Sequence, residues 1–350
     1  MQKRFIPLML FLGLTFSSLA QIDTSSTLVV EKNQEAELAY NQGVAALSKQ
    51  QYSEAITSFT NAVTSKPSFT PAHVNLGVAL SAIGNYAQAI DAFNRALALD
   101  STQGRVWSAR GIALFNQQKY ASAAESLQKA VDLNYLTEDN FYYLGASLFL
   151  MEAYAQAKNA YDEVLKINSA NANAYSDRAS CYKMLEKFDE AERDYRQAIA
   201  LNPKFYVAWD NLGSLQVRKK NYDAALGSFG KAVEIKPDFY VGFNNRGEAY
   251  FLQGEYSAAA QDFKKALELN PKYSFVYNNM GVMYAQQGRH KEAIDMYTKA
   301  IQLDENYGAA YFHRANSYEL LQDFEHGCQD LQKARSVGFS VPGSFLSGCN

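Results

Sequence analysis

The stretch VGFNNRGEAYFLQGEYSAAAQDFKKALELNP, residues 241–271, contains the pattern that decides the fold. Apolar and aromatic residues recur at helical spacing over 241–253 and again over 256–269. Gly254 interrupts the first run, and Pro271 follows the end of the second. The stretch therefore predicts two helices joined by a tight turn.

The same two-helix pattern recurs every 34 residues, with no insertion or deletion over residues 36–341. A small residue stands at one position of each first helix: Gly43, Gly77, Gly111, Gly145, Ala179, Gly213, Gly247, Gly281 and Ala315. A large residue follows it by sixteen positions in each second helix: Phe59, Phe93, Leu127, Tyr161, Tyr195, Phe229, Phe263, Tyr297 and Leu331. Nine copies in register predict a repeat protein. A single helix pair cannot bury its own apolar faces, so it is stable only when stacked on its neighbours.

These residues and this period resemble the tetratricopeptide repeat family. The resemblance implies an all-α fold, an α-solenoid that forms a right-handed superhelix of nine helix-turn-helix repeats, with the first helices lining a concave groove. It covers residues 36–341 and leaves a linker at 21–35 and a C-terminal tail at 342–350. Members of the family usually bind peptides or proteins, which makes a binding scaffold the expected function.

Composition excludes several other classes of protein. With 48% hydrophobic and 13% aromatic residues, the chain is too apolar to be disordered. It carries 33 basic and 36 acidic residues, a net charge of −3, without the basic blocks of a nucleic-acid-binding protein. It has no phosphate-binding glycine loop, no G-x-S-x-G sequence and no H-E-x-x-H sequence. We therefore expect no enzymatic activity, no cofactor and no nucleic-acid partner.

Residues 1–20 have the pattern of a cleavable signal peptide. Two basic residues precede the apolar run 5–16, and the small residues Ser18 and Ala20 suit a signal-peptidase site. Because about 20 apolar residues are needed to cross a bilayer as a helix, the run is short for a membrane anchor, although an uncleaved anchor is the alternative. We expect an exported protein, periplasmic or secreted, whose mature chain has no stable membrane span.

Arginine and aspartate appear together in alternate repeats. The residue before the small-residue position is an arginine in odd repeats from the third onward, and leucine or methionine in even repeats. Sixteen residues later, three of these odd repeats carry an acid, which predicts ion pairs between the two helices of a repeat: Arg178–Asp194, Arg246–Asp262 and Arg314–Asp330. A functional arginine–carboxylate site is the alternative, but repetition favours a structural role.

Positions on the first helices that face the groove in the family divide into two regions. In the first four repeats they predict an apolar wall, typical of a protein-binding surface: Tyr40, Val44, Leu47, Val74, Val78, Ile112, Phe115, Tyr142 and Phe149. Later positions are more polar, and asparagines recur directly before the leucine or arginine position: Asn75, Asn211, Asn245 and Asn279. A carboxamide donates to a carbonyl and accepts from an amide, so this row suits an extended peptide backbone. The alternative is that each asparagine only bridges adjacent repeats.

The chain contains three cysteines. Cys181 lies at a small-residue position and is expected to be a buried structural thiol. Cys328 and Cys349 flank apolar tail residues that can cover the last helix, and an exported compartment permits a disulfide between them; two free thiols are the alternative. His326 near Cys328 is far short of a four-ligand zinc site, so no metal site is predicted.

The sequence thus predicts a non-enzymatic protein–protein interaction scaffold that binds a peptide or protein segment in its concave groove, within a cell-envelope complex. The alternative is a self-associating structural protein, a homo-oligomer assembled through exposed solenoid ends or through the apolar wall. Glycan binding by groove aromatics such as Tyr142 is a third and less favoured hypothesis.

Overall fold

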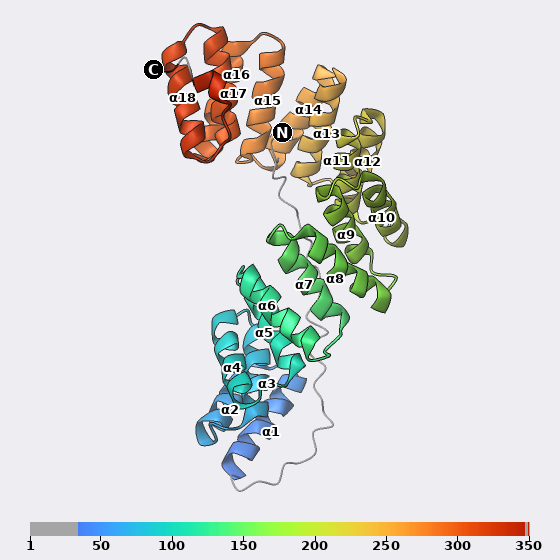
Figure 1. Ribbon diagram of the computed structural model, residues 1–350, viewed down its shortest axis with the longest axis vertical. Coiled ribbons are helices and arrows are strands. Elements are labelled where there is room, and N and C mark those ends of the chain that lie inside the picture. The colour runs from blue at the N-terminus through green and yellow to red at the C-terminus, as the bar shows by residue number, and fades with distance from the viewer. Residues whose placement is uncertain (1–33, 347–348, 350) are drawn as a thin grey trace. The chain divides into compact units, whose positions relative to one another are not determined.

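The computed structural model describes residues 34–346 and 349, and the secondary structure of these residues is entirely helical (Figure 1). The first helices of the pairs are α1 (Gln34–Ser48), α3 (Thr70–Ala82), α5 (Gly104–Asn116), α7 (Glu138–Leu150), α9 (Ala172–Met184), α11 (Tyr206–Arg218), α13 (Tyr240–Gln253), α15 (Ser274–Gln286) and α17 (Gly308–Leu320). The second helices are α2 (Tyr52–Ser65), α4 (Tyr86–Leu99), α6 (Tyr120–Asp132), α8 (Tyr154–Ile167), α10 (Phe188–Leu201), α12 (Tyr222–Ile235), α14 (Tyr256–Leu269), α16 (His290–Leu303) and α18 (Phe324–Ser336). The predicted all-α fold of consecutive helix pairs is confirmed.

One further helix follows the array. The single-turn helix α19 (Gly343–Leu346) follows the last pair, within the predicted tail. The predicted signal peptide, residues 1–20, and the linker up to residue 33 lie outside the described residues.

The helical array divides into two compact units, and the boundary lies between Leu201 and Asn202. The described residues 34–201 of the first unit contain α1 to α10, and those of the second unit contain α11 to α19. Within each unit, a first helix packs on its own second helix, on the second helix of the preceding pair and on neighbouring first helices. Within each unit, described second helices do not contact one another. The first helices therefore form a continuous face in each unit.

The turn inside each pair contains one residue with left-handed backbone. These residues have φ between 59° and 90° and are Gln50, Gly84, Gln118, Glu152, Glu186, Lys220, Gly254, Gly288 and Gln322. Only three of the nine are glycine, although the left-handed conformation costs other residues roughly 1–2 kcal/mol. Tertiary packing of the pairs therefore sets this turn more strongly than the local sequence does.

In the seven pairs whose small residue is glycine, the large residue of the second helix lies directly on that glycine of the first. A Cβ atom on Gly281 would be 2.5 Å from Cε1 of Tyr297, and one on Gly77 would be 2.5 Å from Cε1 of Phe93. The ring therefore occupies the space that a side chain at the glycine position would need. Because burial of such a ring contributes about 1.5–3 kcal/mol, the contact explains why the two residue types recur together.

Candidate functional site

The apolar wall predicted on the first helices is not an exposed surface. Leu47, Ile112, Phe115, Tyr142 and Phe149 are each less than a tenth exposed, and Val74 is equally buried. Their helices pack against two second helices and against neighbouring first helices, which together cover these side chains. This corrects the prediction, because spacing along a helix gives the face of a residue but not how much of that face the next repeat covers.

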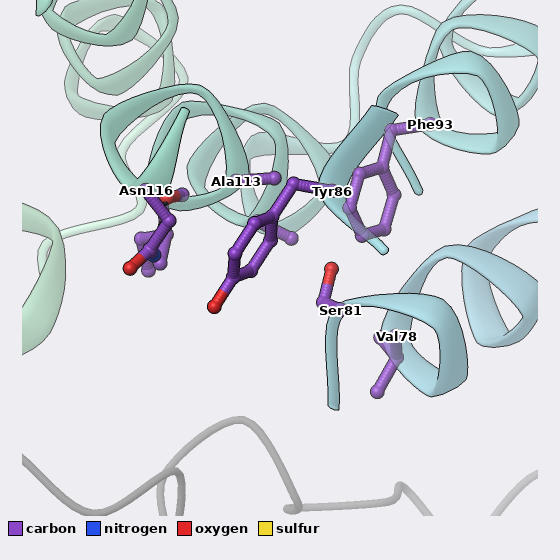
Figure 2. Close-up of a pocket in the computed structure, with 8 residues that line it drawn as sticks. Val78, Ser81, Tyr86, Phe93, Ala113 and Asn116 are labelled. Atoms are coloured by element: carbon purple, nitrogen blue, oxygen red, sulfur yellow. Dashed lines mark hydrogen bonds between the residues drawn. The ribbon is translucent and has the colours of Figure 1, made fainter. Parts of the chain in front are cut away.

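The remaining wall residues, Tyr40, Val44 and Val78, are half-buried and pack against the core of the first two pairs. Val78 and Ile112 also line a small crevice formed by α3, α4 and α5 (Figure 2). The crevice has room for about one water molecule, which is too little for the side chain of a partner. Of the predicted wall, only these half-buried side chains are therefore accessible to a partner.

Three of the four predicted asparagines bond to the preceding repeat. With the donor first, these bonds are Asn75 to Tyr40 (3.1 Å), Asn245 to Asp210 (3.1 Å to each carboxylate oxygen) and Asn279 to Asn244 (3.0 Å). The partners are 35 residues apart in every case, so each bond joins two successive first helices. The bridging alternative therefore holds for these three side chains, and it also fixes the orientation of their carboxamides.

The row of polar side chains extends on both sides of these bonds in the second unit. Asn211 is half-buried on α11, and its side chain has no hydrogen-bond partner among the described residues. At the other end, His313 Nδ1 lies 3.0 Å from Asn278 Oδ1. His313 stands 34 residues after Asn279, a position that the asparagine pattern did not identify because the residue type changes.

Each arginine–aspartate pair expected from the sequence forms two hydrogen bonds inside its helix pair. Nε and Nη2 of Arg246 each donate to Asp262 at 2.7 Å, and the pairs of Arg178 and Arg314 have the same geometry. Asp262 is 6% exposed. Hydrogen bonding to Asp262 raises the pKa of Arg246, so the guanidinium stays charged. The arrangement is a repeated structural contact that holds two helices together.

The structure adds a second contact that sequence analysis did not identify. In three repeats the arginine is also bonded to the second helix of the preceding pair, at the residue sixteen positions earlier. These bonds are Arg110 to Asn94 (2.7 Å), Arg178 to Asp162 (2.8 Å) and Arg314 to Thr298 (2.8 Å). Equal spacing on both sides of the arginine was the available signal. It was missed because the residue type at the earlier position varies.

A half-buried carboxylate, also not predicted, lies on α9. Asp177 Oδ2 accepts a 2.6 Å hydrogen bond from the hydroxyl of Tyr142 on α7. Burial raises the pKa of Asp177 to about 7, although the bond from Tyr142 acts in the opposite direction. Cys181, one turn later, is the buried free thiol expected from the sequence, and burial raises its pKa as well. The carboxyl group of Asp177 thus titrates near neutral pH.

The tail is attached to the last pair at two places. Cys328 on α18 and Cys349 form a disulfide, with their Cα atoms 5.3 Å apart. The ring of the tail residue Phe345 lies 5.3 Å from the ring of Phe312 on α17, and the ring of Phe339, just before the tail, lies 5.4 Å from it. The tail therefore covers part of α17, the first helix of the last pair, as the apolar tail residues suggest.

The described residues contain no group of three or more histidine, cysteine, aspartate or glutamate side chains arranged to hold a metal ion. His326 Nδ1 instead lies 2.8 Å from both carboxylate oxygens of Asp323, which raises the pKa of the histidine. No helix in 34–346 has the length and apolar character needed to cross a membrane.

Comparison with known proteins agrees with this geometry. Sequence models of the tetratricopeptide repeat match residues 40–104, 74–134, 108–173, 172–205, 206–239, 240–273 and 274–307, which together span 40–307. No curated protein sequence matches the chain significantly.

Several solved structures have similar folds. One is the C-terminal part of a TPR repeat-containing protein from Cytophaga hutchinsonii, which is 20% identical, covers 68% of this chain and 97% of that chain, and gives a TM-score of 0.51. YrrB, described as a TPR protein with an unusual peptide-binding site, is 24% identical over 53% of this chain and 95% of its own, with a TM-score of 0.48. MamA is 24% identical over 46% and 95%, with a TM-score of 0.43.

Proposed function

Because this chain belongs to the tetratricopeptide repeat family, whose members are protein-interaction scaffolds, we propose that it binds an extended peptide segment of a partner protein along the face of its first helices. The activity is binding without catalysis. The proposed site is the row of polar side chains on α11, α13 and α15, in the second unit: Asn211 and Asn279 are half-buried and can reach a ligand, and the buried Asn245 lies between them in the row.

The observation that carries this proposal is the unpaired carboxamide of Asn211 beside two carboxamides that are held in place. The Nδ2 groups of Asn245 and Asn279 are fixed by bonds to the preceding first helix. A fixed carboxamide needs no reordering when a ligand arrives, which lowers the entropic cost of binding. Asn211 has both a donor and an acceptor available, which matches the alternating groups of a peptide backbone.

The experiment combines site-specific crosslinking with binding measurements. A photoreactive residue placed at 211 is expected to capture a partner in the native cell, and the same residue at Lys264, exposed on α14, is the control. A synthetic peptide of the captured segment should bind the purified protein, and Asn211→Ala with Asn279→Ala should weaken binding at least about tenfold, the equivalent of 1.4 kcal/mol. Unchanged binding by this double variant would contradict the proposal.

We place the scaffold in the cell envelope because of residues 1–20, whose charged start, apolar run and small residues are typical of a signal peptide. The partner would then be an envelope or secreted protein. Sequencing the N-terminus of the protein purified from its host tests this directly. We expect the mature chain to begin at Gln21, and a chain that retains residues 1–20 would refute export by cleavage.

Self-association is a second candidate function, favoured by the exposed apolar residues at the turn between α17 and α18. Leu320 is 67% exposed and Phe324 is 62% exposed. Light scattering coupled to size-exclusion chromatography should then show a concentration-dependent oligomer that Leu320→Ser and Phe324→Ser abolish. Leu252→Ser, at a less exposed turn position, is the control. A monomer at all concentrations would eliminate this candidate.

A further inference from the structure

The arginine of the seventh repeat differs from its equivalents in one respect. Nε and Nη2 of Arg246 donate to Asp262, but Nη1 has no hydrogen-bond partner among the described residues. Nη1 of Arg178 and of Arg314, by contrast, is bonded to the preceding second helix. Among Arg178, Arg246 and Arg314, which each pair with an aspartate, only Arg246 has an Nη1 without a partner among the described residues.

The difference arises from the residue sixteen positions before the arginine. Asp162 and Thr298 stand there for Arg178 and Arg314, whereas Gly230 stands there for Arg246. A second glycine, Gly227, lies one turn earlier on α12. A Cβ atom built on either glycine meets nothing within 4 Å, so the space beside them is open.

Both glycines lie inside a helix, where glycine is less favourable than any residue except proline. Neither is required by packing, since no neighbouring atom excludes a side chain there. Glycines explained by close packing, such as Gly213, have a ring within 3 Å of the added Cβ. Gly227 and Gly230 therefore open a surface on α12 that close packing does not require.

The equivalent position two repeats earlier shows what can surround such an arginine. An open depression next to Arg178 is lined by side chains of α8 and α9, namely Asn159, Asp162, Glu163, Leu165, Lys166 and Tyr175. Moving 68 residues along the sequence replaces Asn159 and Asp162 by Gly227 and Gly230, and Tyr175 by Phe243. The ring of Phe243 lies 5.4 Å from the Arg246 guanidinium, as the ring of Tyr175 does at Arg178.

We propose that this position on the outer side of the seventh repeat binds the carboxylate of an aspartate or glutamate side chain from a partner protein. The carboxylate would accept a hydrogen bond from Arg246 Nη1 in the place where Asp162 bonds Arg178. That precedent shows that the same guanidinium accommodates two carboxylates, one from each side. Asp223 and Glu234, the acids on the same helix, already bond Gln253 and Lys231.

This surface is separate from the row of asparagines, because the guanidinium of Arg246 is bonded to Asp262 on the second helix α14, whereas the asparagines bond to first helices. The inference therefore stands whether or not the first helices bind a peptide. It gives the scaffold a second, charge-selective contact for an acidic segment.

The test uses NMR of the full-length protein with ¹⁵N-labelled arginine, titrated with sodium acetate as the carboxylate probe at constant ionic strength. The guanidinium resonances of Arg246 should shift and saturate, while those of Arg178 and Arg314 should not. Gly230→Asp, which places the chain's own carboxylate at the position, should abolish the shift. Gly230→Ala, which adds no acceptor, should retain it and controls for the change in helix propensity.

Three results would overturn the proposal. They are the absence of a saturable shift at Arg246, equal shifts at all three arginines, and an unchanged acetate response in Gly230→Asp. A parallel titration with sodium phosphate decides the class of anion. Saturation by phosphate but not by acetate would reject a carboxylate ligand, and saturation by acetate supports it.

Discussion

Asp262 accepts two hydrogen bonds of 2.7 Å from Arg246, and its side chain is almost completely removed from water. Replacing the arginine by methionine leaves this carboxylate buried without its counter-charge. Loss of one member of a buried pair costs about 3–5 kcal/mol, and the partial exposure of Arg246 places the expected loss at the lower end. Urea unfolding followed by circular dichroism measures this loss of stability.

The double variant Arg246→Met with Asp262→Met should lose much less stability, within about 1 kcal/mol of the natural protein, because no unpaired charge remains. The eighth repeat supports this expectation, since it carries Met280 and Met296 at the two equivalent positions. Equal losses in the single and double variants would show that the pair contributes through packing alone.

Glycine-to-alanine substitutions on neighbouring helices should change stability in opposite directions. At Gly213 the new Cβ would lie 2.7 Å from Cε1 of Phe229, so overpacking should cost about 1–3 kcal/mol. At Gly227 the Cβ meets nothing within 4 Å, and better helix propensity should add up to about 1 kcal/mol. Melting temperatures compare the two variants. Destabilisation of similar size at both positions would contradict the open space beside Gly227, and an unchanged Gly213→Ala would contradict the close ring contact.

The 34-residue period and the residue types were sufficient to predict the helix pairs. They also predicted the two recurring positions, one small and one large, at which the two helices of a pair pack. Gly281 and Tyr297 could be matched from the sequence because both requirements, a missing side chain and a large ring, are visible as residue types. The arginine–aspartate spacing was informative for the same reason. Each of these contacts lies within one helix pair, where sequence separation determines geometry.

Contacts between repeats were harder to predict. Phe149 is buried because neighbouring helices cover it, and spacing along one helix does not contain that information. The bond from Tyr142 to Asp177 has the same 35-residue spacing as the asparagine bonds, but it was missed because the residue types at both positions change. The candidate binding row was therefore found only in part, and the open position beside Gly230 required the structures of the other repeats for comparison.

Stability should decrease as pH rises from about 4 to about 7, in part because of Asp177. Its pKa is about 7 in the folded chain against an ordinary value of 3.8, so the folded state binds more protons in this window. Above the folded pKa the decrease from this group should stop. Asp177→Asn keeps an acceptor for the Tyr142 hydroxyl and removes the titration.

Urea midpoints at several pH values, compared between the natural protein and Asp177→Asn, isolate this contribution. The comparison matters because the pKa of His326, raised by Asp323, also makes stability fall with rising pH. The free energy of unfolding of the natural protein, relative to that of Asp177→Asn, should decrease from pH 4 to pH 7. A constant difference over this range would show that Asp177 is not protonated in the folded state near neutrality.

The bond between Cys328 and Cys349 gives a prediction that counts thiols. In urea without reductant the chain should titrate a single thiol, that of Cys181, and after reduction it should titrate three. In the folded, unreduced protein Cys181 should not react, because it is fully buried and its pKa is raised. Three thiols in the unreduced, unfolded sample would refute the disulfide. Cys349→Ser should lower stability by up to about 3 kcal/mol, as expected for a closed loop of this length.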